Sequence, residues 1–341
     1  MRKPVRCINT MIRVLPLVIL SAVIIACPVY ARTVCDMIGR QVHVPETMER
    51  IASPYRVATD MIFALGVEDK LIAISTRYPN PVMKSFCEGI DRIGYADQDS
   101  SIEEFLRLRP DGVFMRPGPL VSRLEEFGIP VFCLKVEDPD SMIRGLMMMA
   151  DILGRQDHAN KITSYYRQKL DYIKGCTSAI VQKRTVYMAG FQSVFATIGG
   201  DFYQDHLIRA GGGVNVAHEL TGGWVSVSRE HLVAWNPDFI LLAPYSHINA
   251  RDVMDEALEC VNAVRKERIH TFPSYLDAWD LPTPESILGI MWLANILYPD
   301  NIRFDMEKEA EYFYSQFYGR YPKPVEWKTG HPGIDSQKGF P

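Results

Sequence analysis

The sequence predicts an α/β protein of two lobes, each with a mostly parallel sheet, separated by one long α-helix. The first observation is a segment that occurs twice, EEFLRLRPDGVF at 103–114 and EHLVAWNPDFIL at 230–241, with a constant offset of 127 residues. The second is an alternation of apolar runs with helical patterns in both halves of the chain. The third is a polar–apolar helical stretch at 156–175 between those halves. Two similar lobes imply a cleft, and a cleft implies a ligand.

Strands and helices alternate through the first half. The apolar runs predict strands at 50–53, 70–75, 112–115 and 130–135, and the helical patterns predict helices at 56–65, 102–109 and 119–127. The repeated segment has the pattern of a short helix, a Pro-Asp turn and a buried strand. Asp138-Pro139 then opens a further helix that ends at Gly154, because these residues are typical helix boundary signals.

The second half repeats this alternation after the long helix, which would be roughly 30 Å long at 1.5 Å per residue. Here the patterns predict strands at 184–190, 239–243 and 268–272, and helices at 203–211, 228–235, 252–263 and 284–297. The tail after Tyr321 is rich in proline and glycine, so we expect it to be irregular. We therefore divide the chain into a signal peptide at 1–31, a first lobe at 32–154, a long helix at 155–176, a second lobe at 177–321 and a tail at 322–341.

The first 31 residues have the pattern of a secretory signal. A basic start precedes an apolar run at 14–26, which is shorter than the roughly 18–20 residues that a membrane-spanning helix needs. Small residues up to Ala31 fit a signal peptidase site. Ile24-Ile25-Ala26-Cys27 fits a lipoprotein motif instead, with Cys27 as the lipid-bearing residue. Both alternatives predict a periplasmic or otherwise extracytoplasmic protein.

The composition argues against several classes of function. A formal net charge of −4 provides no basic field for nucleic acid. The sequence has no GxSxG, P-loop or dinucleotide-binding glycine motif, so nothing supports an enzyme, and no HxH, HExxH or CxxC supports a bound metal. Five cysteines follow Ala31, an odd number that allows at most two disulfides and leaves their pairing open: Cys35, Cys87, Cys133, Cys176 and Cys260.

Six blocks of sequence carry a resemblance to a known family. They are DMIGRQVHVPETMERIAS, ALGVEDKLIAIS, EEFLRLRPDGVF, RAGGGVNVA, SREHLVAWNPDFILL and IMWLANILYPD, in that order. Over about 33–300 the chain resembles the periplasmic substrate-binding proteins of ABC importers, within the group that binds iron-siderophores, haem and cobalamin. The resemblance implies two Rossmann-like lobes, one rigid helix that joins them, and a small closure on binding. It also implies an importer permease dimer with its ATPase as partners. We expect a monomer with no covalently bound cofactor.

Arginines follow three successive strands of the first lobe: Arg56 in PYRV, Arg77 in TRYPNP and Arg116 in RPGP. Ligands of open α/β sheets bind beyond the carboxyl ends of the strands, so these side chains could line one wall of the cleft, with Tyr78 beside Arg77. Guanidinium groups suit carboxylate, phosphate or catecholate oxygens. The alternative is that these arginines are solvated surface residues.

The corresponding loops of the second lobe carry aromatic residues, namely Trp224, Tyr245, Tyr275 and Trp279. Flat rings stack on planar ligands, and the alternative is that these residues pack the core of the lobe. Together the two walls predict an anionic metal chelate as ligand, first of all a ferric siderophore. The alternatives are haem, cobalamin or another corrinoid, and a sensing protein that presents its complex to a receptor.

Glu103 and Glu230 begin the helices of the two repeated segments. The helix dipole favours a carboxylate in the first turn, which is one sufficient reason for both residues. If the lobes are pseudo-equivalent, however, the two glutamates should lie on the same face of the molecule. The family resemblance implies docking through one acidic residue on each lobe, so we predict that Glu103 and Glu230 contact the permease.

Overall fold

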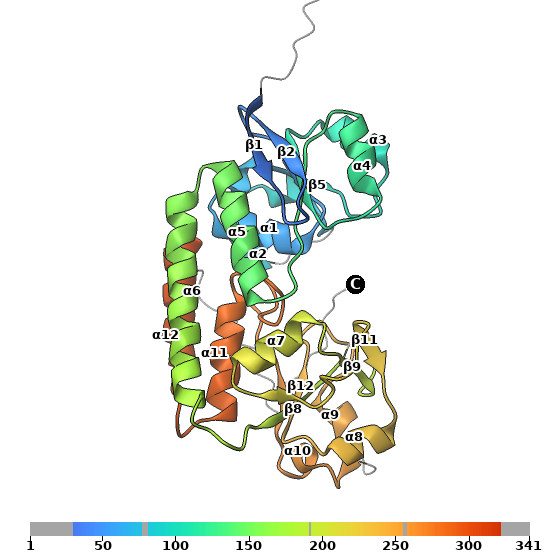
Figure 1. The fold of residues 1–341 in the computed structure, drawn as a ribbon, viewed down its shortest axis with the longest axis vertical. Coiled ribbons are helices and arrows are strands. Elements are labelled where there is room, and N and C mark those ends of the chain that lie inside the picture. The colour runs from blue at the N-terminus through green and yellow to red at the C-terminus, as the bar shows by residue number, and fades with distance from the viewer. Residues whose placement is uncertain (1–29, 77–80, 191, 255–257, 322–341) are drawn as a thin grey trace, which may run out of the picture.

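The structure, a computed structural model, describes residues 30–76, 81–190, 192–254 and 258–321. Two separate sheets lie towards opposite ends of the long axis, and helix α6 (Gln156–Thr177) runs alongside both halves (Figure 1). We call the part before α6 the first lobe and the part after it the second lobe. Within the described ranges, no helix has the length and apolar character needed to cross a bilayer.

The first lobe is built on a parallel sheet of five strands in the order β5-β4-β3-β6-β7. The strands are β3 (Ile51–Ser53), β4 (Leu71–Ile74), β5 (Gly94–Tyr95), β6 (Gly112–Met115) and β7 (Val131–Cys133). The helices are α1 (Arg56–Ala64), α2 (Pro81–Phe86), α3 (Ile102–Leu108), α4 (Leu120–Glu126) and α5 (Pro139–Leu153), with short 3-10 turns at Glu68–Lys70 and Ile90–Arg92. The chain leaves β3 on one side towards β4 and returns on the other side at β6. The β3–β6 pair is therefore a topological switch point.

An antiparallel hairpin, β1 (Tyr30–Cys35) and β2 (Gln41–Pro45), precedes this sheet and was not among the predicted elements. Asp36, which follows β1, holds the hairpin in place. Its carboxylate pairs with the Arg40 guanidinium at 2.6 Å and accepts a hydrogen bond from the backbone N–H of Cys133 at 3.1 Å. The DMIGR segment thus ties the hairpin to β7.

The second lobe has a six-stranded sheet in the order β11-β9-β8-β12-β13, with β10 beside β8. The strands are β8 (Thr185–Ala189), β9 (Ala196–Ile198), β10 (Val214–Asn215), β11 (Trp224–Ser226), β12 (Phe239–Leu242) and β13 (Ile269–Thr271). The helices are α7 (Tyr203–Ala210), α8 (Arg229–Trp235), α9 (Ala250–Val253), α10 (Asn262–Arg265) and α11 (Ser286–Leu297). β8 is parallel to β10 and β12, whereas β9 and β11 add an antiparallel edge. The β8–β12 pair forms the second switch point.

The repeated segment folds in the same way in both lobes. Helices α3 and α8 have seven residues each, and the strands β6 and β12 that follow them have four. Each helix ends at a residue with a left-handed backbone, Arg109 with φ 49° and Asn236 with φ 43°. Every one of these boundaries is displaced by the same 127 residues as the sequences, so the predicted similarity of the lobes is confirmed for this unit.

The aspartate of each Pro-Asp turn ties its turn to the central strand of the lobe. The Asp111 carboxylate accepts a hydrogen bond from the backbone N–H of Arg50 at 2.8 Å, directly before β3. The Asp238 carboxylate accepts one from the backbone N–H of Thr185 at 3.1 Å, at the start of β8. The Pro-Asp pair therefore recurs because it fixes equivalent switch-point strands in the two lobes.

The helix predicted at 252–263 is wrong. The structure has two short helices there, α9 and α10, and residues 255–257 lie outside the described ranges. Asn262 explains the second start, because its backbone N–H donates to Asn236 Oδ1 at 2.7 Å and its side-chain amide donates to Asp238 Oδ1 at 2.8 Å. These contacts with the α8–β12 turn begin a new helix where local periodicity predicted a continuous one.

A second helix, α12 (Met306–Phe317), runs beside α6 and was also not predicted. Glu309 joins the two helices, since it pairs with Lys169 at 2.5 Å and accepts a hydrogen bond from the Tyr165 hydroxyl at 2.7 Å. After α12, the Tyr318 hydroxyl donates to Asp60 Oδ1 in the first lobe at 2.9 Å. The segment that we assigned to the second lobe at 177–321 therefore ends in residues that contact both lobes.

All five cysteines that follow Ala31 are free thiols in the described part of the chain. Cys133 is buried in β7, in agreement with a role in the core, and burial raises the pKa of its thiol to about 11. Cys35 in the first lobe and Cys260 in the second lobe are exposed.

Candidate functional site

The carboxyl ends of the two switch-point strand pairs face the junction of the lobes. In the first lobe, β3 leads into Tyr55-Arg56 and β6 leads into Arg116. In the second lobe, β8 leads into Gly190 and β12 into the segment with Tyr245. Open α/β sheets bind ligands at this place, so these strand ends form the candidate ligand surface.

A direct ion pair shows that the two lobes meet at this surface. Arg56, the first residue of α1, contacts Asp277 from the loop after β13 through two bonds of 2.5 Å, Nε to Oδ2 and Nη2 to Oδ1. The Asp277 side chain is 2% exposed and that of Arg56 is 42% exposed. Burial acts to lower the pKa of the guanidinium, but the neighbouring carboxyl groups, with Asp277 first, outweigh burial and the net pKa is raised. The charge of Arg56 is therefore already compensated within the protein.

Arg116 differs from Arg56 in having no carboxylate partner among the described residues. Arg116 directly follows β6 and is exposed to solvent. Its guanidinium lies 5.9 Å from the centre of the Tyr55 ring. Burial raises the pKa of the Tyr55 hydroxyl to about 12, although Arg116 partly opposes this. An exposed guanidinium held over an aromatic face is well suited to bind an anion.

Two other predicted residues of the first wall, Arg77 and Tyr78, lie outside the described residues, so their roles remain predictions. Sequence reasoning also passed over two residues that matter at this surface, Tyr55 and Asp277. Tyr55 directly precedes Arg56 in the PYRV loop, so the same strand-end argument that indicated Arg56 could have indicated Tyr55. Asp277 contacts a residue 221 positions away, and no local pattern marks such a partner.

Trp224 was predicted in a loop beyond a strand end, but it is the first residue of the edge strand β11, and its ring lies beside Gly190 at the end of β8. Its indole is half-buried at the start of β11 and packs edge-on against Phe202, with 6.1 Å between the ring centres. Gly190 lies against it: a Cβ atom there would meet the Trp224 ring at 3.5 Å and Ser246 Oγ at 3.4 Å, and its φ of +146° is unfavourable for other residues. The end of β8 is thus shaped around the Trp224 ring.

Tyr245 is half-buried, and its hydroxyl points into the protein. It donates a hydrogen bond to Asp280 Oδ2 at 2.8 Å, and burial together with that carboxylate raises the pKa of the tyrosine. Asp280 has no exposed surface, so it orients Tyr245 rather than meeting a ligand itself.

Tyr275 and Trp279 lie in the core instead of on the surface. Trp279 is 0% exposed, and its indole N–H donates to the Tyr314 hydroxyl at 3.0 Å. The Tyr275 ring centre is 4.5 Å from that of Tyr314. Tyr314 belongs to α12, the helix that was not predicted, and this helix explains why neither ring offers a face to a ligand in this conformation. Tyr275 and Trp279 therefore pack the core, which was the alternative to ligand contact.

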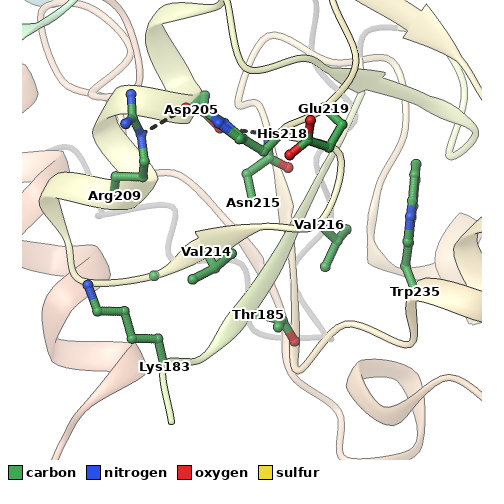
Figure 2. Close-up of a pocket in the computed structure, with 11 residues that line it drawn as sticks. Lys183, Thr185, Asp205, Arg209, Val214, Asn215, Val216, His218, Glu219 and Trp235 are labelled. Atoms are coloured by element: carbon green, nitrogen blue, oxygen red, sulfur yellow. Dashed lines mark hydrogen bonds and ion pairs between the residues drawn. The ribbon is translucent and has the colours of Figure 1, made fainter. Parts of the chain in front are cut away.

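A cavity of about 440 Å³ lies elsewhere in the second lobe, at the amino ends of β8 and β10 (Figure 2). Asp205 has no exposed surface there and lies 3.0 Å from both Arg209 Nε and His218 Nδ1, with Trp235 on the far side of the cavity. The Asp205 carboxylate is paired with Arg209 there, and the cavity lies at the opposite edge of the sheet from Gly190 and Tyr245. The carboxyl ends of the switch-point strands are therefore the better candidate for the ligand surface.

Glu103 and Glu230 are exposed second residues of α3 and α8. Both helices lie on the side of the molecule away from α6, one in each lobe (Figure 1). The pKa of Glu103 is lowered by a hydrogen bond from its own backbone N–H, and that of Glu230 by a hydrogen bond with Ser228. Each lobe thus presents one ionised carboxylate from an equivalent position. In the described ranges, no group of three or more His, Cys, Asp or Glu residues is placed to hold a metal ion.

Comparison with known proteins places these features in a family context. A sequence profile described as periplasmic binding protein matches residues 51–276. The molybdate-binding protein MolA of Haemophilus influenzae is 24% identical over 86% of this chain and 92% of its own length. A solved structure of MolA bound to molybdate has a TM-score of 0.77 at 21% identity and covers 86% of this chain and 99% of its own.

Two further relatives are named for other properties than molybdate binding. YvrC of Bacillus subtilis, an uncharacterised ABC transporter substrate-binding lipoprotein, is 25% identical over 81% of this chain and 88% of its own length. The vitamin B12-binding protein of Yersinia pestis is 25% identical over 58% of this chain and 70% of its own length. The name of YvrC and the description of the MolA structure both refer to an ABC transporter, and the solutes named for MolA and for the Yersinia protein differ.

Proposed function

This chain belongs to the periplasmic binding protein family, and from that membership we propose that it captures an anionic metal chelate, first of all a ferric siderophore, and delivers it to the permease of an ABC importer. The family and the relatives support a solute-binding protein of an ABC transporter. The ligand class rests on one observation above all. Arg116 is exposed at a switch point, beside Tyr55, without a carboxylate partner among the described residues.

The electrostatics of the surface support an anion. Asp277 compensates Arg56, so Arg116 supplies the positive charge of the described strand ends in the first lobe. Guanidinium donors match the paired oxygens of carboxylate, hydroxamate and catecholate groups. Trp224, on the facing lobe, adds a partly exposed ring that suits the flat organic part of a chelate.

Molybdate is a second candidate, supported by the similarity to MolA over 86% of this chain. A small oxyanion would also bind to the Arg116 guanidinium, but it would leave Trp224 without a ring or chain to contact. Haem and corrinoids are further candidates, and the similarity to the vitamin B12-binding protein over 58% of this chain supports a corrinoid.

A titration panel separates these candidates. The chain without residues 1–31 is titrated with ferric catecholate, hydroxamate and carboxylate siderophores, molybdate, cyanocobalamin, haem and free ferric ion, with tryptophan fluorescence and calorimetry as readouts. We expect one anionic chelate to bind with a submicromolar to micromolar dissociation constant. Equally tight binding of free ferric ion, or binding of cyanocobalamin alone, would contradict the proposed ligand class.

Arg116→Ala tests the residue on which the proposal rests. A charged hydrogen bond contributes about 1.5–3 kcal/mol, so the affinity for the chelate should fall about 10- to 150-fold. Arg123→Ala, which removes another exposed arginine of the same lobe, is the matched control and should bind like the unmodified protein. If both variants bind with unchanged affinity, Arg116 is not part of the site.

The proposed place of work is the periplasm or the outer face of the membrane. Residues 1–29 of the predicted signal, with Cys27, lie outside the described residues, and its last two residues, Tyr30 and Ala31, begin β1. The name of YvrC as a lipoprotein supports the lipid-anchored alternative, and the mass of the mature protein distinguishes the two. We also propose that Glu103 and Glu230 contact the permease, because equivalent positions on the two lobes match a partner of two similar subunits.

A further inference from the structure

Four carboxyl groups are buried where the two lobes meet. Asp60 comes from α1 of the first lobe, and Asp277, Asp280 and Glu285 come from the segment between β13 and α11 of the second. Their exposed fractions are 4%, 3%, 0% and 0%. Among the described residues, Arg56 is the only cation that forms an ion pair with any of them, and it pairs with Asp277. Four buried carboxylates with one counter-charge would be strongly unfavourable, so some of the carboxyl groups must hold protons.

Hydrogen bonding indicates which groups are candidates for protonation. Asp277 has both oxygens on Arg56 and is the carboxylate of the pair. Asp60 accepts from Tyr318 through Oδ1, and Glu285 accepts from the backbone N–H of Asp277 through Oε2 at 3.1 Å. One oxygen of each of the three other carboxyl groups has no hydrogen-bond partner among the described residues: Asp60 Oδ2, Asp280 Oδ1 and Glu285 Oε1. A buried oxygen without a partner is less costly on a neutral carboxyl group than on a carboxylate.

The charged and titratable groups around this pair come from each neighbouring element. Arg56 lies on the same helix as Asp60, Asp277 comes from the second lobe, and Tyr314 and Tyr318 come from α12 and its end. Burial, and then the charge of Asp277, raise the pKa of Asp60. Burial, and then the charges of Asp60 and Asp277, raise the pKa of Glu285.

Asp280 lies further along the same segment, where Tyr245 and Gln204 face it. Burial raises its pKa to about 6, and the hydrogen bonds from those two residues partly oppose the shift. Asp280 therefore titrates within the range of pH that an extracytoplasmic protein meets, and it adds a negative charge to the junction as the pH rises.

We propose that the junction is a proton-dependent clamp between the lobes. While Asp60 and Glu285 hold their protons, Asp277 pairs with Arg56 and the lobes stay together. When both ionise, negative charges from the two lobes face each other across a single arginine, and the lobes move apart by a small distance. The clamp would make capture tighter in acidic surroundings, a consequence that rests on the proposed function.

The direction of the effect on stability follows from proton binding. The folded chain holds protons on these carboxyl groups at a pH where the unfolded chain, with ordinary pKa values of about 4, has lost them. The folded state then binds more protons than the unfolded state. Stability is therefore greatest in mild acid and falls as the pH rises through the raised pKa values.

The distance between the lobes is the direct test, and it needs no ligand. Cys35 and Cys260 are exposed, one in each lobe, and accept spin labels once the partly buried Cys176 is replaced by serine. We expect the distance distribution to move to longer values as the pH rises from about 5.5 to about 8.5 and the carboxyl groups of the junction lose their protons. In Asp60→Asn/Glu285→Gln, which mimics the protonated pair, the distance at the higher pH should remain short.

The matched control is Glu126→Gln/Glu259→Gln, which changes one exposed carboxylate in each lobe and should respond to pH like the unmodified protein. Thermal unfolding gives a second readout. Its midpoint should fall as the pH rises between the two values, and the Asp60/Glu285 variant should lose most of this change. If that variant does not fold, Asp60→Asn alone should lose about half of it.

An unchanged distance in the unmodified protein, or an equal response to pH in the Asp60/Glu285 variant, overturns the clamp. Neither result affects the proposed function, which the chelate titration tests independently. Conversely, the distance between the lobes could respond to pH as expected while the protein binds no chelate. That result would refute the proposed ligand class and support the clamp.

Discussion

At the scale of single residues, charge compensation decides which arginine is available to a ligand. Arg56 and Arg116 both follow strands of the first lobe, and nothing in their immediate sequence separates them. The difference is Asp277, which pairs with Arg56 from the other lobe. Arg56 therefore holds the lobes together, whereas Arg116 is the better candidate for contact with an anion.

Arg56→Ala should destabilise the protein because it leaves Asp277 buried without its counter-charge. Loss of one partner from a buried pair costs about 3–5 kcal/mol, and the half-exposed position of Arg56 places the expected loss at or below the lower end of that range. Urea unfolding at neutral pH measures it. Arg56→Ala/Asp277→Asn should recover part of the stability, and a single variant as stable as the unmodified protein would show that the pair contributes little.

At the scale of elements, the repeated helix–turn–strand unit links the fold to the permease. The unit has the same boundaries, the same left-handed helix end and the same Asp contact in both lobes. Its first helical turn therefore presents Glu103 and Glu230 in equivalent surroundings. A partner built from two similar subunits can contact both in the same way.

Glu103→Ala/Glu230→Ala should leave chelate affinity unchanged and abolish most uptake in cells. Exposed charge pairs contribute strongly to orientation and to the rate of association, which is what a docking contact requires. The control is Glu307→Ala/Glu311→Ala, which removes two exposed carboxylates from α12, on the side of the molecule near α6 (Figure 1). Normal transport by the first variant at a normal protein level would reduce both glutamates to helix-start carboxylates.

At the scale of the whole molecule, the lobes are joined by more than one segment. α6 is braced along its length by α12 through Glu309, and α12 leads into Tyr318, which contacts the first lobe. Two helices packed side by side resist bending more than a single helix, because bending must also shift their shared contacts. This arrangement supports the expectation of a small closure.

Scattering curves with and without ligand at one pH should therefore nearly superimpose. The unmodified protein is measured free and with the chelate that binds most tightly, and the radius of gyration is compared. A protein in which Glu309→Ala removes the bond between α6 and α12 provides the contrast, because its radius of gyration should respond more to ligand. A large decrease for the unmodified protein would contradict a rigid link.

The sequence by itself determined the parts of the fold that depend on neighbours along the chain. The strand and helix alternation, the helix from Asp138 to Gly154 and the long helix α6 all follow from periodicity and from end signals within a few residues. The repeat revealed the similarity of the lobes because both copies use the same local contacts. Strand-end positions likewise indicated Arg56, Arg116 and Trp224 as residues near a switch point.

Only the tertiary structure decided which of those residues face a ligand. α12 covers Tyr275 and Trp279, Asn262 starts a new helix on a turn that lies 26 residues earlier, and Asp277 compensates an arginine 221 residues away. None of these partners lies within the window in which periodicity or capping acts. The physical reason is that burial and charge compensation depend on which atoms meet in space, whereas the local pattern records only which backbone conformation each segment favours.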